Sequence, residues 1–377
     1  LSVAPAGAQQ AAANAELQTK ARQAVLMDAQ SGAILFQHKA DEAAPPASMS
    51  KLMTLAVLFK AMKSGQVKPE DEFVMSENAW RKGGAPSGTS AMMVPVNTKA
   101  RVDELIQGII IQSGNDSAIA VAEGLAGSEE AFAKLMDTEA RRIGLKGSTF
   151  RNATGLHDPG HLMTATDLAV LSRFLIREYP EHYPVFAQKE FQYRKHKFIN
   201  RNPLLFMGIN ADGLKTGHTK EAGFGLVGSA VENDRRLIVV VGGLPTADDR
   251  KNEAKRLLEW GFKSFGEFKL FDAGETVGHA RVWGGEAMYV TLVGQGDVAV
   301  VLPRFPANQK LRAEILYNSP LKAPIKKGDQ IARLKVTSSS NAVNEVPLYA
   351  GSDVASAGIM RKGIDSLLHL AFKWVPL

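Results

Sequence analysis

The stretch APPASMSKLMTLAVLFKAMK, residues 44–63, decides what this chain is expected to be, because an apolar helical pattern starts directly after two prolines. On a helix, positions i and i+3 share a face, so the hydroxyl of Ser48 and the amine of Lys51 are predicted to lie side by side. Two interpretations remain open from these residues alone. Ser48 is either the N-cap of the helix, with Lys51 as a solvated lysine, or a nucleophile beside its base.

Length and composition indicate a globular protein with room for two domains. The chain has 377 residues, of which 45% are hydrophobic, and no cysteine, which excludes disulfides, a thiol nucleophile and thiolate metal sites. The formal net charge is +6, but no long basic run accompanies it, so nucleic acid is not an expected partner. The charge is read as a solvated surface, with attraction to anionic lipid or cell wall as the second interpretation.

Both ends of the chain carry segments that differ from a folded domain. Residues 1–20 are read as a tail rich in Ala and Gln, with A-x-A spacings that suit the end of a signal peptide. No stretch reaches the ~18 apolar residues that a spanning helix needs. Residues 356–377 include GIDSLLHLAFKWVPL, which predicts an amphipathic helix that anchors the chain in a membrane interface. A helix packed on its own domain is the alternative.

Residues 21–265 predict an α+β domain. Two hairpins are expected, in 22–40 and in 223–243, and helices are expected from Ser48, within 102–145 and at the end of the domain. A further helix is expected from Thr164, which forms a capping-box pattern with Asp167. Strands at both ends with helices between them imply helices packed on an antiparallel sheet.

The composition changes after residue 265. Apolar and polar residues alternate in AMYVTLV, VAVVLP, KLRAEILY, QIARLKV and NEVPLYA, so residues 266–355 are predicted to form a small β-sandwich domain. A second S-x-x-K pattern, from Ser319 to Lys322, lies among these strands. It contains a proline, so a helix that would bring the two side chains together is not expected there.

Two further motifs favour the nucleophile interpretation. SGND, at 113–116, lies between two helical patterns, so its side chains are expected on a short turn that faces a cleft. DGLKTGHT, at 212–219, opens the late hairpin with a glycine that lets a substrate backbone approach the strand. Each motif taken alone is also an ordinary turn. The candidate site residues that these motifs offer are Ser113, Asn115, Lys215, Thr216 and Gly217.

The order S-x-x-K, S-x-N, K-T-G on helix, turn and strand resembles that of penicillin-binding proteins and β-lactamases. The likeness continues in IIIQSGNDSAIAVAEGLAGSEEAF, in INRNPLLFMGINADGLKTGHTKEAGFGLVGSA and in KKGDQIARLKV, and it covers the chain from about residue 20 to the terminal helix. The chain is therefore similar to the low-molecular-mass penicillin-binding proteins, which are serine-type D-alanyl-D-alanine carboxypeptidases.

This resemblance implies an enzyme that removes the terminal D-alanine from peptidoglycan pentapeptides through an acyl-enzyme on Ser48. It implies acylation by β-lactams, no metal or organic cofactor, and a periplasmic location at the inner membrane, attached through the C-terminal helix. Lys51 would be the base, Ser113 a proton relay, and Asn115 a donor to the substrate amide.

The resemblance also implies how the substrate is bound. Lys215 and Thr216, followed by Gly217, would bind the terminal carboxylate, and Arg250 would add a second cation. The backbone N–H groups of Ser48 and His218 would form the oxyanion hole.

Three other functions remain as alternatives. A β-lactamase is disfavoured because no glutamate between Ser113 and Lys215 has an asparagine four residues later. An endopeptidase usually lacks the extra β-domain, and a non-catalytic cell-wall scaffold would not need intact motifs.

Two other motif matches do not predict binding sites. GFGLVG, at 223–228, continues as a strand and not as the helix of a dinucleotide site, and HDPGH, at 157–161, reads as a loop and not as a zinc site.

Overall fold

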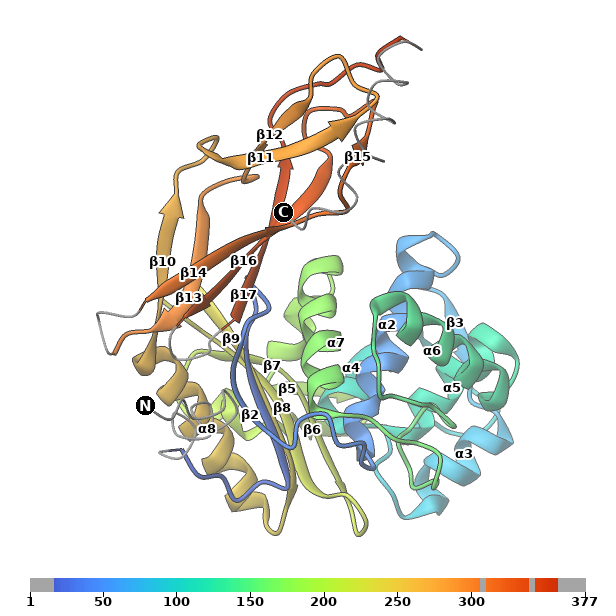
Figure 1. The fold of residues 1–377 in the computed structure, drawn as a ribbon. Helices are drawn as coiled ribbons and strands as arrows, with labels where there is room; N and C mark the ends of the chain where they lie inside the picture. Colours follow the sequence, from blue (N-terminus) through green and yellow to red (C-terminus); the bar gives the residue numbers. More distant parts are fainter. Residues whose placement is uncertain (1–16, 306–309, 339–342, 359–377) are drawn as a thin grey trace. The chain divides into compact units, whose positions relative to one another are not determined.

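The structure is a computed structural model that describes residues 17–305, 310–338 and 343–358 (Figure 1). Its contacts divide the chain into two compact units, one ending at Phe262 and the other beginning at Lys263. The predicted C-terminal helix, 356–377, lies almost entirely outside the described residues, as does most of the predicted tail, 1–20. Among the described residues, no helix is long and apolar enough to cross a membrane.

The first unit is built on a five-stranded antiparallel sheet with the strand order β2-β1-β9-β8-β7. Both predicted hairpins belong to it, because Val25 on β1 lies opposite Val240 on β9. β7 is an edge strand, and the carbonyl of Gly213 on it accepts a hydrogen bond from Asn202 Nδ2 at 2.7 Å. The strands are β1 (Gln23–Asp28), β2 (Ile34–His38), β7 (Ala211–Thr219), β8 (Gly223–Glu232) and β9 (Arg235–Leu244).

Helices cover both faces of this sheet (Figure 1). The α-helices are α2 (Lys51–Lys63), α3 (Glu77–Gly83), α4 (Val102–Gln107), α5 (Asn115–Ala126), α6 (Glu129–Ile143), α7 (Ala165–Glu178) and α8 (Ala247–Ser264). Short helical turns and strands complete the unit: η1 (Ala47–Ser50), η2 (Ala85–Ser87), η3 (Gly108–Gln112), η4 (Tyr183–Ala187), η5 (Pro203–Phe206), β3 (Glu72–Val74), β4 (Lys99–Arg101), β5 (Glu190–Tyr193) and β6 (His196–Ile199).

The alternation of side chains along the strands explains why both faces are covered. Val25 and Val240 belong to the core that the sheet shares with α2, α5 and α7. Leu26, one position further, points to the other face, where a Cβ added at Gly261 of α8 would lie only 2.5 Å from it. Every residue of β1 is buried, as expected for a strand enclosed between two helical layers.

The helix expected from Ser48 begins later than predicted, at Lys51. Residues Ala47–Ser50 form a separate 3₁₀ turn, in which the backbone N–H of Lys51 bonds to the carbonyl of Ser48. Ala47, with a φ of 49°, lies in the left-handed region, so the chain bends sharply after the two prolines. The nucleophile candidate therefore sits on a tight turn before the helix.

The helix expected from Thr164 is confirmed, but only half of its capping box forms. Thr164 Oγ1 accepts a hydrogen bond from the backbone N–H of Asp167 at 3.0 Å. The Asp167 carboxylate does not return to the cap, because it accepts hydrogen bonds from the backbone of Lys146 and Gly147 and from the hydroxyl of Ser148. α7 is thus joined to the loop that follows α6.

From Phe265 onward, the residues that the structure describes form β-strands and their connections, as predicted. A six-stranded sheet has the order β14-β16-β17-β12-β11-β15, and β10 pairs with β13. Ser319 lies in a bend and Lys322 on a two-residue strand, so the second S-x-x-K forms no helix, as expected. The strands are β10 (Phe265–Phe271), β11 (Thr276–Trp283), β12 (Tyr289–Val293), β13 (Val298–Pro303), β14 (Leu311–Leu316), β15 (Leu321–Lys322), β16 (Gln330–Ser338) and β17 (Val343–Ala350).

Candidate active site

Ser48 and Lys51 lie side by side, with Lys51 Nζ 2.9 Å from Ser48 Oγ. Ser48 is half-buried, whereas Lys51 is fully buried. The N-cap of α2 is Ser50, whose side chain makes no capping hydrogen bond. The structure therefore does not support the alternative in which Ser48 caps the helix and Lys51 is solvated.

Lys51 is held by two further acceptors. Its Nζ lies 2.6 Å from Asn115 Oδ1 and 2.6 Å from the carbonyl oxygen of Thr154. A neutral amine has two hydrogens and one lone pair, so these acceptors can take both hydrogens and leave the lone pair directed at the Ser48 hydroxyl. The geometry suits a base that removes the serine proton.

The electrostatic surroundings favour the neutral form of Lys51. Burial, and after it the positive charge of Arg201, lowers the pKa of Lys51 to about 7, against the opposing effect of Asp116. A lysine in water has a pKa of about 10.4 and is almost wholly protonated at neutral pH. Here a substantial share of the amine is uncharged at that pH, as a general base requires.

The S-x-N motif lies between η3 and α5, next to Lys51. Ser113 has a φ of 64°, ends the π-helical turn η3, and is 2% exposed. Its Oγ has no hydrogen-bond partner among the described residues. Asn115 is the first residue of α5, and its Nδ2 donates to Thr89 Oγ1 at 2.9 Å. The predicted turn is present, and the buried hydroxyl of Ser113 on it is available for a hydrogen bond or a proton transfer.

The K-T-G motif lies on the edge strand β7 beside the turn that carries Ser48. A Cβ added at Gly217 would lie 2.9 Å from the carbonyl oxygen of Pro46, so only glycine allows this close approach. Thr216 is buried, whereas His218 is exposed and its ring stacks on Phe224 at 3.8 Å. The strand expected to bind substrate therefore borders the nucleophile.

Lys215 is the second fully enclosed lysine of the site. It is 1% exposed, and its Nζ donates to the carbonyl of Thr216 at 3.2 Å. The pKa of Lys215 is held well below its usual value, mainly by burial. The positive charges of Lys51, Arg201 and Arg250 lower it further. Lys51, Arg201 and Arg250 thus lie close enough to Lys215 to lower its pKa, and this cluster of four basic side chains suits a carboxylate ligand, whose negative charge would favour their protonated forms.

Arg250, in the first turns of α8, completes this group. Its guanidinium lies over the ring of Phe224, 5.6 Å from the ring centre, and its Nε is buried without a hydrogen-bond partner among the described residues. Burial, and then the charge of Arg201, lowers the pKa of Arg250. An unpaired donor here is available to an anionic ligand.

The sequence analysis missed three contributors to the site. Asp116 is fully buried, and its carboxylate accepts hydrogen bonds from the backbone N–H groups of Met92 and Met93 at 2.8 and 2.9 Å. Burial raises the pKa of Asp116, and these backbone hydrogen bonds oppose the rise. Its position directly after Ser113-Gly-Asn115 could have indicated that Asp116 lies near the site. The second missed contributor is the carbonyl of Thr154, for which the sequence carries no signal because every residue has a backbone carbonyl.

Arg201 is the third missed residue. Its Nη1 donates to Ser90 Oγ at 2.5 Å, which joins the segment after β6 to the segment before β4. Burial lowers the pKa of Arg201. It lies within INRNPLLF, 199–206, a stretch already included in the resemblance, so the signal was present but was not assigned to a role.

Both parts of the chain match known protein families. Residues 8–246 match the D-alanyl-D-alanine carboxypeptidase family, and residues 265–356 match the C-terminal domain of penicillin-binding protein 5. D-alanyl-D-alanine carboxypeptidase DacA of Haemophilus influenzae is 37% identical over 353 residues, which cover 93% of this chain and 89% of that protein.

Solved structures show the same fold. The crystal structure of penicillin binding protein 5 from Haemophilus influenzae superposes with a TM-score of 0.78 at 35% identity, covering 94% of this chain and 100% of that one. Penicillin-binding protein D2 from Listeria monocytogenes in its ampicillin-bound form has a TM-score of 0.56 at 28% identity, covering 65% and 98%. A match over most of the first unit, with relatives that span nearly the whole chain, shows that the chain belongs to the D-alanyl-D-alanine carboxypeptidase family of serine peptidases.

Proposed function

We propose that this carboxypeptidase works through a covalent acyl-enzyme formed on Ser48, with Lys51 as its base. The observation that carries the assignment is the 2.9 Å contact between Ser48 Oγ and the buried Nζ of Lys51, an amine whose pKa is lowered to about 7. An unassisted serine hydroxyl is almost never ionised at neutral pH and needs such a base.

The reaction has two steps. Lys51 takes the hydroxyl proton while Ser48 Oγ forms a bond to the carbonyl carbon of the penultimate D-alanine. The carbon–nitrogen bond then breaks as Ser113 gives its hydroxyl proton to the departing amine of the terminal D-alanine and takes in exchange the proton held by Lys51, which makes Lys51 neutral again. Lys51 next removes a proton from a water molecule whose oxygen attacks the ester carbonyl carbon. The bond from that carbon to Ser48 Oγ breaks, the shortened peptide leaves with a free carboxyl group, and Lys51 returns the proton to Ser48 Oγ.

The substrate is proposed to lie along β7. Lys215, Thr216 and Arg250 would bind its terminal carboxylate, as the cluster of basic side chains and the free donor of Arg250 support. The backbone beside Gly217 would pair with the peptide, since β7 is an edge strand. The backbone N–H groups of Ser48 and His218 would stabilise the oxyanion, and Asn115 Nδ2 would exchange Thr89 for the substrate amide.

A β-lactam would enter by the same chemistry. Its strained amide would present a carbonyl carbon to Ser48, and its carboxylate would meet the cluster of basic side chains. Opening the ring leaves the amine attached to the acyl group. The leaving group therefore cannot diffuse away, which favours a stable adduct. The ampicillin-bound form of the Listeria relative supports this ligand class for the fold.

The location of the enzyme is also proposed. We infer that residues 356–377 form an amphipathic helix that attaches the periplasmic enzyme to the surface of the inner membrane, on the basis of the sequence pattern alone. Sedimentation with vesicles of anionic phospholipid tests this proposal. The full chain should sediment with the vesicles, and a chain ending at residue 355 should stay in solution.

The assignment of Ser48 is tested by intact-protein mass spectrometry after exposure to penicillin, together with D-alanine release from a pentapeptide. A single adduct on the wild type and none on Ser48→Ala, with loss of D-alanine release in the variant, is the expected result. Rapid destruction of penicillin without an adduct would favour a β-lactamase. Absence of both reactions in the wild type would point to a scaffold.

A further inference from the structure

We infer that Asn152 and Gly155 are positioning residues of this enzyme, because together they fix the turn that presents a backbone carbonyl to Lys51. That carbonyl belongs to Thr154, and its oxygen lies 2.6 Å from Lys51 Nζ. The inference rests on the proposed function, in which Lys51 is the base. The turn, residues 152–156, lies between α6 and α7, outside the three motifs of the site. Both residues would act through the Thr154 carbonyl and not by touching a reacting atom.

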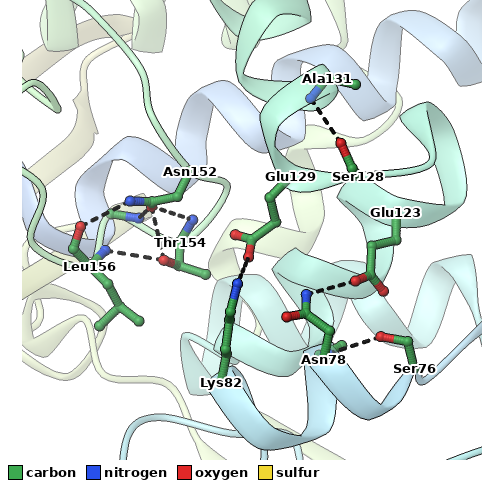
Figure 2. Close-up of polar contacts among 12 residues, drawn as sticks. Ser76, Asn78, Lys82, Glu123, Ser128, Glu129, Ala131, Asn152, Thr154 and Leu156 are labelled. Atoms are coloured by element: carbon green, nitrogen blue, oxygen red, sulfur yellow. Dashed lines mark hydrogen bonds and ion pairs between the residues drawn. The ribbon is translucent and has the colours of Figure 1, made fainter.

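The side chain of Asn152 closes this turn from within (Figure 2). Its Oδ1 accepts hydrogen bonds from the backbone N–H and the hydroxyl of Thr154, at 3.1 and 3.0 Å, and from the backbone N–H of Gly155 at 2.8 Å. Its Nδ2 donates to the carbonyl of Leu156 at 3.1 Å. Thr154 and Gly155 are buried. Because a buried N–H without a partner is costly, the turn cannot keep this shape without the Asn152 side chain except at a large cost.

The same contacts set the direction of the Thr154 carbonyl. This carbonyl and the N–H of Gly155 belong to one planar peptide unit, in which the two groups point in opposite directions. Asn152 Oδ1 holds the N–H on one side, and Lys51 Nζ meets the carbonyl oxygen on the other. A rotation of this peptide plane would therefore break both hydrogen bonds, so the side chain that fixes the N–H also aims the carbonyl.

Gly155 allows the turn to lie directly against η1, which carries the nucleophile. Its φ of 78° is in the left-handed region, and a Cβ added to it would lie 2.0 Å from the carbonyl oxygen of Ala47 and 2.6 Å from Ser50 Oγ. Only glycine permits this approach. The carbonyl of Ala153 adds a second contact, because it accepts a hydrogen bond from Thr54 Oγ1 on α2 at 2.7 Å. A side chain at position 155 would push the turn away from both elements.

The consequence for catalysis follows from the two acceptors of Lys51. Its neutral amine gives one hydrogen to Asn115 Oδ1 and the other to the Thr154 carbonyl, so that its lone pair faces the Ser48 hydroxyl. If the carbonyl moves away, the lone pair loses this orientation, and a small displacement of a catalytic group costs rate far out of proportion to the distance. The protonated amine also loses a hydrogen-bond acceptor, which lowers the pKa of Lys51 further.

A change in the pH midpoint of acylation would report on this carbonyl, because Asn152 and Gly155 carry no charge. The charged and titratable groups that interact with Lys51 lie on four other segments: Asp116 on α5, His161 before α7, Arg201 after β6 and Lys215 on β7. Replacing either positioning residue by alanine leaves all four groups in the chain. A defect of folding alone would lower the number of active molecules without moving the midpoint.

The first comparison is between Asn152→Ala and Asn344→Ala. Asn344 is a buried asparagine of the second unit, and its Oδ1 and Nδ2 bond to the backbone N–H and carbonyl of Val301, each at 2.9 Å. Its replacement by alanine therefore removes the same kind of contacts from a different unit of the chain. This control shows what the loss of a buried asparagine costs when the turn at 152–156 is intact.

The second comparison is between Gly155→Ala and Gly160→Ala, in the same loop. A Cβ added at Gly160 would come closest to Arg151 Nε, at 2.7 Å, and this long side chain can move aside. The measurement for every variant is the rate constant of acylation by penicillin from pH 5 to 9, counted per penicillin-binding site. Lys51→Ala is measured alongside them.

Asn152→Ala and Gly155→Ala should both acylate about tenfold more slowly than the wild type, with the pH midpoint moved to lower pH. The two controls should keep the wild-type rate and midpoint. Because Asn152→Ala only removes atoms and Gly155→Ala only adds one carbon, each variant decides the question if the other does not fold.

Three results would overturn the inference. One is an unchanged rate and midpoint. Another is a slower rate with the wild-type midpoint, since the Thr154 carbonyl would then still bond to Lys51. The third is a smaller number of penicillin-binding molecules that react normally, which is a folding defect alone. If Lys51→Ala acylated at the wild-type rate, the proposed function would fail, whereas an inactive Lys51→Ala beside normal Asn152→Ala and Gly155→Ala would overturn this inference only.

Discussion

Lys215 lies close enough to Lys51 for the charge of one buried amine to lower the pKa of the other. Two lysines that are both fully enclosed would be a serious cost in an ordinary core, because burial disfavours a charged amine and like charges repel. Both effects act on Lys215, whose pKa is held well below its usual value. A bound carboxylate would offset them, because an opposite charge nearby favours the protonated amine.

The first prediction concerns the pH dependence of acylation. Since Lys51 must be neutral to accept the Ser48 proton, the acylation rate should rise with pH around a midpoint of about 7, the pKa of the buried amine. Stopped-flow measurement with a chromogenic cephalosporin between pH 5 and 9 checks this. Lys51→Ala should lower the rate by about 10²–10⁴-fold, the usual contribution of a general base. Near-normal acylation of Lys51→Ala would show that another group is the base.

The second prediction concerns stability. Lys51 keeps a pKa of about 7 when folded, against about 10.5 as its ordinary value, so between these pH values the unfolded chain binds one proton more than the native one. The free energy of unfolding of the wild type relative to Lys51→Met should therefore rise with pH from 7 to 10.5, by about 1.4 kcal/mol per pH unit at most. Urea unfolding of both proteins at several pH values measures the difference. A flat difference would mean that Lys51 is protonated in the folded enzyme.

A third prediction separates catalysis from stability at Ser113. Its hydroxyl is buried without a partner among the described residues, so Ser113→Ala removes a polar group that the fold does not use. D-alanine release from a pentapeptide should fall by about 10²-fold or more, while the melting temperature stays the same or rises. A lower melting temperature with unchanged turnover would show that the hydroxyl has a structural role and no part in proton transfer.

The fourth prediction concerns Asp116. An asparagine there would keep one acceptor oxygen but turn an amide donor toward the backbone N–H groups of Met92 or Met93, which need an acceptor. Asp116→Asn should therefore cost about 1–3 kcal/mol in the free energy of unfolding, measured in urea. Because Asp116 raises the pKa of Lys51, the pH midpoint of acylation should also move down. An upward movement would contradict the arrangement of charges described for the site.

Much of this site could be predicted because its chemistry sits in short segments. Ser48 and Lys51 are three residues apart, and Thr164 marks the start of its helix by a local rule. The sequence could not show that Thr154 supplies a carbonyl to Lys51, because any residue type carries that group and only the fold brings the loop there. The start of α2 was placed too early, since the left-handed turn at Ala47 gives no periodic signal.

In the second unit, too, some strands could be identified from the sequence and others could not. Strands that alternate cleanly, such as β12 and β17, were identified from the sequence, whereas β10 and β11 were not. β10 has a run of three exposed residues, Glu267–Lys269, and β11 mixes a glycine, a histidine and an arginine with its apolar residues. Strands of this kind are held by their neighbours in the sheet and carry little pattern of their own.

The edge of the sheet at β7 also limits what can add to it. An open edge strand invites pairing with other chains and is a common start of aggregation. Here Asn202 Nδ2 already bonds to the carbonyl of Gly213, so this carbonyl is not available to an added strand. The part of β7 from Lys215 to Thr219 lies beside the turn that carries Ser48. Only the short part from Lys215 to Thr219 remains for pairing with an added strand. Along β7, a second copy of the chain therefore finds little free backbone with which to pair.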